Sequence, residues 1–335
     1  GRSVVNGDPV KGNKGLSLYL AKVRKEDGNL NNIEVVRLKD KLGTRQLPTA
    51  ELLLKGTKAK KIGKDGEGVR FISNMLNITR LHNSISAVGY MRRIIALARD
   101  YSNKRVTFGR KIKEHVLHYR TLAWMEMTFR GNLLFLLNIT LMLGRIDNGS
   151  ESSEDKMLFR LMTPLLKLFT AKEVMKVTSE GLECFGGLGY MENSYLPMIF
   201  RDAQVLPIWE GTTNILSLDL LRAILKWPKS LEAFYEHLKR DLSTQDMSSM
   251  TDNTLKNAVK TLSDKLEEWY KSTIKIVRER GYMEFFIRKM AFNMTLLYIC
   301  HKLLLIYTVT NDDKDFETFL YWINRLQTEY EAPQE

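Results

Sequence analysis

Cysteine, histidine and proline are scarce in this chain of 335 residues. It contains two cysteines, Cys184 and Cys300, together with five histidines and seven prolines. Two cysteines cannot form a disulfide framework, and no cysteine or histidine cluster has the spacing of a zinc site. The sequence therefore predicts a protein of a reducing compartment that binds no metal.

Long apolar runs are missing as well. The longest lies near Leu133 to Leu143, is broken by Asn138, and is shorter than the about 20 apolar residues that a bilayer span needs. The first residues, Gly1 to Ser3, lack the charged and then apolar organisation of a signal peptide. We therefore expect no membrane span and an intracellular protein, with the mitochondrial matrix and the cytoplasm both left open.

Acidic residues are too few to balance the basic ones, and the formal net charge is +12. Residues 1–70 carry sixteen Lys or Arg against eight Asp or Glu, but only one aromatic residue, Tyr19. Nucleic-acid-binding surfaces usually combine such charge with stacking aromatics. A partner with several phosphates or a solvated basic face explains the charge at least as well, so nucleic acid is the least favoured partner.

The hydrophobic pattern divides the chain into strands and then helices. Short alternating runs predict strands at Leu16–Val23, Ile33–Leu38 and Ala50–Leu54. Helical periodicity follows, with Asp65 to Gly68 as a cap. The first expected helix ends near residue 103, and the next two cover about 112–146 and 156–185. A shorter helix follows Thr212, and three or four more lie between Ser230 and Tyr330. The second of these is so apolar that we expect other helices to surround it.

One carboxylate stands alone in the apolar run Val205 to Thr213. It belongs to Glu210, between Trp209 and Gly211. Partial burial beside an indole favours the protonated form of a carboxyl group, which suits a general base near neutral pH. The alternative is that Glu210 only faces the positive end of the helix that begins near Thr213.

A glycine-rich turn, Phe185 to Tyr190, follows the third expected helix. Because its glycines have no side chains, the backbone amides of this turn are uncovered, and a flat or phosphate-bearing ligand could approach closely. A glycine C-cap of the helix explains the same residues without a ligand.

A third motif, Lys104 to Arg110, places cations beside an aromatic ring at the end of the first helix. Arg105 could clamp a pyrophosphate in two-pronged geometry while Phe108 packs on a ring system. Basic residues at a helix C-terminus are also ordinary partners of the helix dipole.

Together these motifs resemble the acyl-CoA dehydrogenase family. The order is Thr79-Arg80, Arg105 to Gly109, Phe185 to Tyr190, and Arg201 to Ala203 followed by Trp209 to Thr212. Within the family the chain looks most similar to the AidB-like branch. That likeness depends on the segment Arg37 to Arg45, on the Ile208-Trp209-Glu210-Gly211 form of the base motif, and on the additional C-terminal helices.

The resemblance implies roles for individual residues. Glu210 would be the base that takes the α-proton of an acyl thioester, with Arg80 near it. The substrate would contact Asn77, Arg80, Trp209 and Gly211. The residues that match FAD contacts, some of them to the FAD of a neighbouring subunit, are Arg105, Thr107, Phe108, Glu183, Gly186, Gly187, Thr212 and Asn214.

It also implies an α+β fold that is mostly α. Residues 1–63 would form the second half of the family's middle β-domain, 64–227 its four-helix bundle, and 228–335 an extra helical domain. The family's N-terminal helical domain and the first half of its sheet would then lie outside this sequence. A homodimer or homotetramer is expected.

The expected activity is FAD-dependent α,β-dehydrogenation of a medium- to long-chain fatty acyl-CoA, with electron-transferring flavoprotein as a possible acceptor. One alternative is an acyl-CoA-binding regulator of lipid metabolism with little turnover. The other is an AidB-like flavoprotein that associates with DNA.

Overall fold

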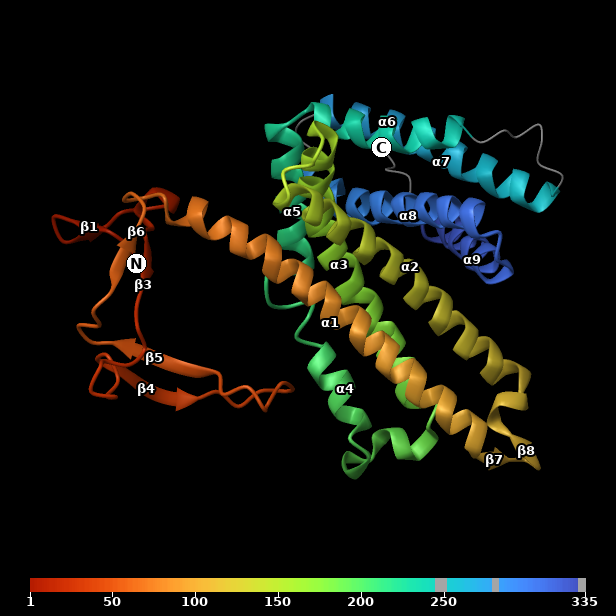
Figure 1. Ribbon diagram of the computed structural model, residues 1–335, viewed down its shortest axis with the longest axis horizontal. Coiled ribbons are helices and arrows are strands. Elements are labelled where there is room, and N and C mark those ends of the chain that lie inside the picture. The colour runs from red at the N-terminus through yellow and green to blue at the C-terminus, as the bar shows by residue number, and fades with distance from the viewer. Residues whose placement is uncertain (245–251, 279–282, 331–335) are drawn as a thin grey trace. The chain divides into compact units, whose positions relative to one another are not determined.

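The computed structural model describes residues 1–244, 252–278 and 283–330 (Figure 1). The chain divides into two compact units, Gly1–Thr79 and Arg80–Glu335. Each unit is considered by itself below. The boundaries predicted at residues 63 and 227 remain predictions, because compactness alone does not define a domain.

The first unit contains six short strands in antiparallel pairs. The predicted strands β4 (Ile33–Leu38) and β5 (Ala50–Leu54) are confirmed and pair with each other. β3 (Leu18–Leu20), within the predicted run Leu16–Val23, pairs with β6 (Lys60–Ile62). β1 (Val4–Val5) pairs with β2 (Asp8–Pro9), and a 3-10 turn, η1, covers Asn13–Gly15. In this unit the strands therefore form two-stranded ladders.

Polar side chains tie the ladders of this unit to one another. Asn31 donates through its amide to the carbonyls of Lys22 and Lys58, at 2.9 and 2.8 Å. The Ser17 hydroxyl donates to Asp65 at 3.3 Å and accepts from the Gly66 amide at 3.1 Å. The cap predicted at Asp65 is therefore corrected: its carboxylate binds Ser17 and Lys61, and the helix α1 (Gly68–Lys104) begins three residues later.

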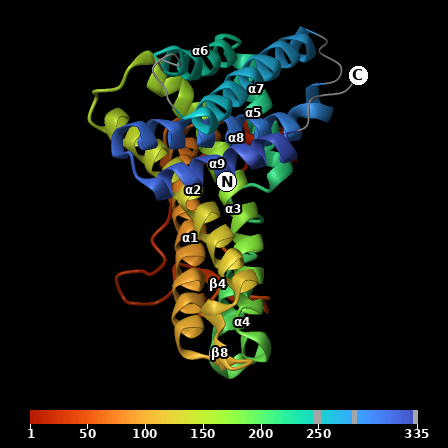
Figure 2. The ribbon, with the colours of Figure 1, turned by 90° about the vertical axis from the view of Figure 1, so that its right-hand side faces the viewer.

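The second unit consists of the Arg80–Lys104 part of α1 and eight further helices within its described residues. These are α2 (Val116–Asp147), α3 (Ser153–Glu183), α4 (Leu196–Ala203), α5 (Thr213–Lys226), α6 (Lys229–Ser243), α7 (Asn253–Arg278), α8 (Met283–Thr310) and α9 (Asp313–Glu329). The predicted long helices are confirmed to within a few residues, whereas α4 was not expected. Figure 2 shows the long helices α1, α2 and α3 running alongside one another.

The most buried helix is α3, not α2. Every side chain from Leu161 to Ala171 on α3 is buried. On α2, by contrast, Leu137 and Leu141 are more than half exposed. The expectation that other helices surround α2 is therefore wrong for this chain by itself, because an apolar composition does not specify which faces find a partner.

Two helices, α2 and α8, are long and apolar enough to cross a membrane by length and composition. The sequence expectation of no span rested on the run near Leu133 and overlooked α8. In the folded unit 72% of the apolar window of α8 is buried, compared with 44% for α2. Packing inside the helical unit thus accounts for the composition of α8.

The helices after Pro228 share a core with those before it. On α9, the Trp322 indole donates to the Met127 carbonyl of α2 at 2.9 Å. Arg325, also on α9, binds the fully buried Glu173 of α3 at 2.7 Å. Burial would raise the pKa of Glu173, but Arg325 and Lys176 outweigh burial and hold the pKa below its usual value. The C-terminal helices are therefore anchored to the bundle by a buried ion pair.

The packing of Trp322 against α2 can be tested at two glycines of α2. A Cβ at Gly131 would lie 2.3 Å from the Trp322 ring, whereas a Cβ at Gly144 would meet nothing within 4 Å. We expect Gly131→Ala to lower the free energy of unfolding by about 1–3 kcal/mol through overpacking. Gly144→Ala should raise it by up to about 1 kcal/mol through helix propensity. Urea titrations compare the two, and equal effects would contradict this packing of α9.

Candidate active site

The predicted base lies in a turn between α4 and α5. Glu210 has φ of 58° and Gly211 has φ of 102°, so both residues are in the left-handed region. A residue other than glycine pays conformational energy there, and such positions concentrate at functional sites. Glu210 is half-buried and Trp209 is 42% exposed. Because α5 begins three residues after Glu210, the helix-dipole interpretation of this carboxylate also remains open.

A buried lysine supports this turn from α3. The ammonium of Lys167 donates to the Gly211 carbonyl at 2.6 Å. The pKa of Lys167 is lowered to about 8: burial is the largest cause, the charge of Arg80 acts in the same direction, and the nearby Glu210 opposes them. The predicted catalytic pair Glu210 and Arg80 therefore lies around one cation that the sequence analysis did not identify.

Arg80 belongs to a second ion cluster. Its guanidinium donates to Asp219 of α5 at 2.7 Å, and Arg160 of α3 donates to the same carboxylate at 2.8 and 3.1 Å. Burial would raise the pKa of Asp219, but the bonds from Arg160 and Arg80 outweigh it, so the pKa lies below its usual value. Nε of Arg80 is buried and has no hydrogen-bond partner among the described residues, which leaves one donor for a ligand.

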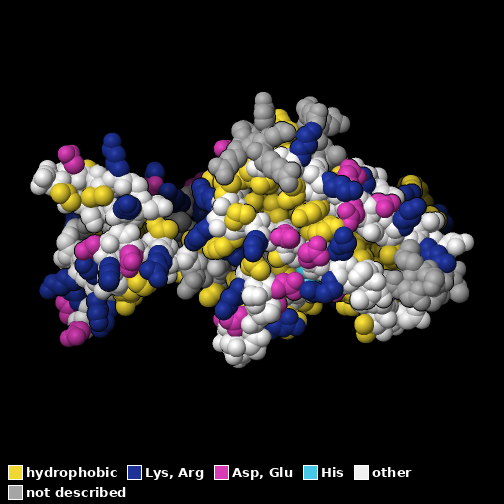
Figure 3. All heavy atoms as spheres, turned by 90° about the horizontal axis from the view of Figure 1, so that it is seen from above, with side chains coloured by type: hydrophobic (Ala, Val, Ile, Leu, Met, Phe, Trp, Pro, Cys, Tyr) yellow, Lys and Arg dark blue, Asp and Glu magenta, His cyan; other side chains and the backbone are white. Residues whose placement is uncertain are grey.

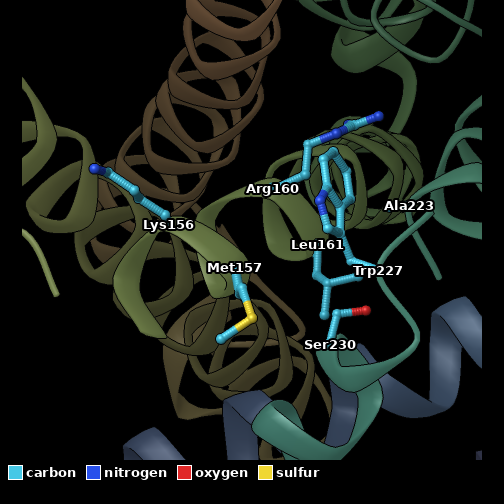
Figure 4. A pocket seen from close by; sticks show the side chains of 7 residues that line it. All are labelled: Lys156, Met157, Arg160, Leu161, Ala223, Trp227 and Ser230. Carbon is cyan, nitrogen blue, oxygen red and sulfur yellow. The ribbon is translucent and has the colours of Figure 1, made fainter. Parts of the chain in front are cut away.

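Figure 4 shows a separate pocket of about 180 Å³ beside this cluster. Arg160 lines it and also binds Asp219. The other lining residues, from α3, α5 and the start of α6, are Lys156, Met157, Leu161, Ala223, Trp227 and Ser230. Glu210 is not among the lining residues of this pocket.

Two of the predicted cofactor residues share a shallow pocket at the start of α5. Thr212 and Asn214 line it together with Lys172 of α3 and Arg288 of α8, and its volume is about 240 Å³. Arg288 donates to the Asn214 side chain at 2.6 Å. Two cations beside a helix N-terminus suit a phosphate-bearing ligand. Arg288 had no local signal in the sequence, since it lies seventy-four residues away from Asn214.

The residues Arg105, Thr107 and Phe108 lie in a hairpin of β7 (Val106–Thr107) and β8 (Arg110–Lys111). Phe108 and Gly109 at its tip have φ of 50° and 81°. Positive φ at both loop positions is the geometry of a two-residue type I′ turn. Phe108 is 97% exposed, so the turn presents a bare aromatic ring in a strained backbone. Such a ring fits the stacking role expected of it.

The glycine-rich turn forms a short 3-10 helix, η3 (Gly186–Tyr190), after α3. Gly186 has φ of 58°, and a Cβ at Gly186 or Gly187 would meet nothing within 4 Å. The backbone is therefore open to a ligand, although the same φ also serves a helix C-cap. Glu183 is exposed one turn before, at the end of α3.

The predicted site residues fall into two groups within the chain. Tyr101 and Phe185, with ring centroids 4.9 Å apart, join the end of α1 to the glycine turn, next to the hairpin. At 1.5 Å per residue, Arg80 lies roughly 36 Å along α1 from Lys104. Figure 1 likewise shows β7 and β8 at the end of the long helices away from α5. One chain therefore does not bring Phe108 to Glu210. Asn77 is half-buried in the first unit, and its role stays a prediction.

Cysteines and metal ligands give no second chemistry here. Cys184 and Cys300 are buried and free. Burial, together with the nearby Glu180, raises the pKa of Cys184 to about 12. Across the described part of the chain, no three His, Cys, Asp or Glu residues are grouped so that they could hold a metal ion.

Comparison with known proteins identifies the family of this chain. Residues 66–225 match the family described as acyl-CoA dehydrogenase, C-terminal domain. The chain belongs to the acyl-CoA dehydrogenase family, whose members are flavoproteins of fatty acid metabolism.

Several relatives are similar over much of the chain. It is 47% identical over 297 residues to acyl-CoA dehydrogenase family member 11 of Caenorhabditis elegans, covering 88% of this chain and 48% of that protein. It is 33% identical over 212 residues to the putative acyl-CoA dehydrogenase AidB of Escherichia coli, covering 63% and 38%. The chain thus spans about half the length, or less, of these curated relatives. The likeness to AidB expected from the motifs is confirmed.

Solved structures share the fold. The crystal structure of Caenorhabditis elegans ACDH-11 in complex with C11-CoA has a TM-score of 0.91 and 44% identity, covering 96% of this chain and 55% of that one. A Bacillus anthracis acyl-CoA dehydrogenase complexed with FAD has a TM-score of 0.72 and 19% identity, covering 89% and 56%. The predicted mostly helical fold is therefore confirmed.

Removing the carboxylate of Asp219 should destabilise the protein. We expect Asp219→Asn to lower the free energy of unfolding by about 3 kcal/mol at pH 7, because two guanidinium groups lose a largely buried partner. Since the pKa of Asp219 is depressed in the fold, its contribution is present above the unfolded value of about 3.9 and disappears as the pH falls below it. Unfolding titrations between pH 2 and 7 measure this. A matched control is Asp264→Asn on an exposed part of α7; a similar loss there would contradict the role of the cluster.

Proposed function

We propose that this chain carries the catalytic base and part of the cofactor site of an FAD-dependent acyl-CoA dehydrogenase. The observation that carries this proposal is the geometry of Glu210. It is the carboxylate of the family's base motif, held in a left-handed turn near the buried ammonium of Lys167. The substrate class is fatty acyl-CoA.

The chain's own residues perform the proton transfer. Glu210 in its charged form takes a proton from the carbon next to the thioester carbonyl. The ammonium of Lys167 supplies a positive charge near this carboxylate. FAD, when bound, would supply the acceptor for the hydride of the neighbouring carbon. The proton stays on Glu210, and a double bond remains between the two carbons.

The cofactor is FAD, and the chain offers surfaces for both ends of such a molecule. Thr212, Asn214, Lys172 and Arg288 suit its phosphates, while Phe108 and the open glycine turn suit a flat ring. Because these groups are separated along α3, with Lys172 eleven residues before its last residue, Glu183, we infer that two subunits complete each site. A homodimer is then the smallest competent unit, and a homotetramer contains two of them.

The crystal structure of the Caenorhabditis elegans relative in complex with C11-CoA supports a substrate with a medium- or long-chain acyl group. Trp209, 42% exposed beside the base, offers an apolar wall for such a chain. Electron-transferring flavoprotein is the proposed acceptor.

A binding protein with little turnover is the second candidate. The complex of the same relative with acyl-CoA favours it, because a bound acyl-CoA requires the site but not the reaction. Association with DNA has less support. On the face of the helical unit in Figure 3, Lys and Arg side chains alternate with Asp and Glu, and no uniformly basic stripe crosses it.

Anaerobic mixing with acyl-CoAs of increasing length tests the proposal in the flavin-loaded holoprotein. We expect bleaching of the flavin absorbance with medium- or long-chain substrates. Glu210→Gln should slow bleaching by about 10²–10⁴-fold, the usual contribution of a general base. Acyl-CoA binding, followed by calorimetry, should change far less.

The matched control is Glu236→Gln, since Glu236 is exposed on α6. It should bleach at the wild-type rate. Tight acyl-CoA binding without bleaching by wild-type protein would establish the binding protein instead. Unchanged bleaching in Glu210→Gln would exclude Glu210 as the base.

A further inference from the structure

We propose that Lys167 is the positioning residue of the base: its ammonium fixes the Glu210–Gly211 turn through the Gly211 carbonyl and holds a positive charge beside the carboxylate. The proposal rests on the proposed dehydrogenase function. It assigns to α3 a role in proton abstraction that the base motif by itself does not contain.

Lys167 stands where helix packing alone would favour an apolar residue. It lies in the run Leu165 to Phe169 of α3, whose five side chains are at most 1% exposed. A buried ammonium loses its hydration, and such a cost is tolerated only when a specific partner compensates it. Strongly perturbed buried ionisable groups also gather at functional sites.

The partner of Lys167 is the backbone of the base turn. The 2.6 Å bond to the Gly211 carbonyl joins the middle of α3 to a residue forty-four positions later. The left-handed conformation of Glu210 is costly to hold without such a tie, whereas Gly211 adopts it freely. The adjoining space is also tight, since a Cβ at Gly211 would lie 3.1 Å from Leu216. Lys167 therefore determines where the Glu210 backbone lies.

Two charged groups act on Lys167 in opposite directions. Glu210 attracts it and Arg80 repels it. Arg80 is in turn bound to Asp219, which Arg160 also binds, so a carboxylate already compensates the charge of Arg80. The carboxylate that attracts Lys167 is that of Glu210, so the positive charge of Lys167 lies near the proposed base.

Three substitutions separate position from charge. Lys167→Met keeps the length of the side chain and removes both donor and charge. Lys167→Gln keeps an amide donor for the Gly211 carbonyl and removes the charge. Lys167→Arg keeps both. A merely structural lysine would leave the pH dependence of proton abstraction the same in all folded variants.

The experiment measures the rate of flavin bleaching by acyl-CoA as a function of pH in the flavin-loaded holoprotein. Exchange of the substrate α-proton with deuterated solvent is followed in parallel, since it reports proton abstraction without hydride transfer. In Lys167→Met and Lys167→Gln we expect the acid limb of both profiles to move to higher pH by about one unit, a tenfold slowing on that limb. Lys167→Arg keeps the charge, so its profile should lie close to that of wild type.

Lys156→Met is the matched control, because Lys156 lies on the same helix with a largely exposed side chain; its profile should equal that of wild type. If Lys167→Met does not fold, Lys167→Gln decides, because it retains the donor for the turn. If the wild type is active and the folded Lys167→Met and Lys167→Gln variants keep the wild-type profile, the proposed role of Lys167 is overturned. The dehydrogenase proposal would stand. A wild type that neither bleaches nor exchanges the α-proton would end the dehydrogenase proposal and this one with it.

Discussion

The burial of α3 is the constraint on which the second unit depends. A helix whose side chains are buried from Leu161 to Ala171 must be enclosed by other elements on all sides. Its polar groups must then find partners on those elements. Lys167 finds the turn before α5, and Glu173 finds Arg325 on α9. One buried helix thereby places the base turn on one side and the last helix on another, so that packing and chemistry are set by the same element.

The sequence predicted the elements of this fold better than their surroundings. The long helices α1, α2 and α3 follow from apolar periodicity sustained over many turns, which is the strongest local signal a sequence carries. The eight-residue α4 is too short for that signal and was missed. Composition also suggested a surrounded α2, although Leu137 and Leu141 are exposed in this chain. Which apolar face is covered depends on distant elements, and no window of sequence contains that information.

The candidate site divides in the same way. Glu210, Thr212 and Asn214 were found because they stand close together in one motif. Asp219, Arg160 and Arg288 were not, since each joins the site through tertiary contacts across tens of residues. Lys167 was the exception that could have been found: a single ammonium in the run Leu165 to Phe169 has no reason to be there unless the fold supplies a partner.

The ion pair between Glu173 and Arg325 makes the last helix a part of the bundle and not an attachment to it. Glu173 is buried on α3 and binds Arg325 of α9 and the half-exposed Lys176. A chain shortened before α9 would lose this guanidinium together with the Trp322 indole that donates to α2. The bundle and its last helix therefore depend on each other for stability.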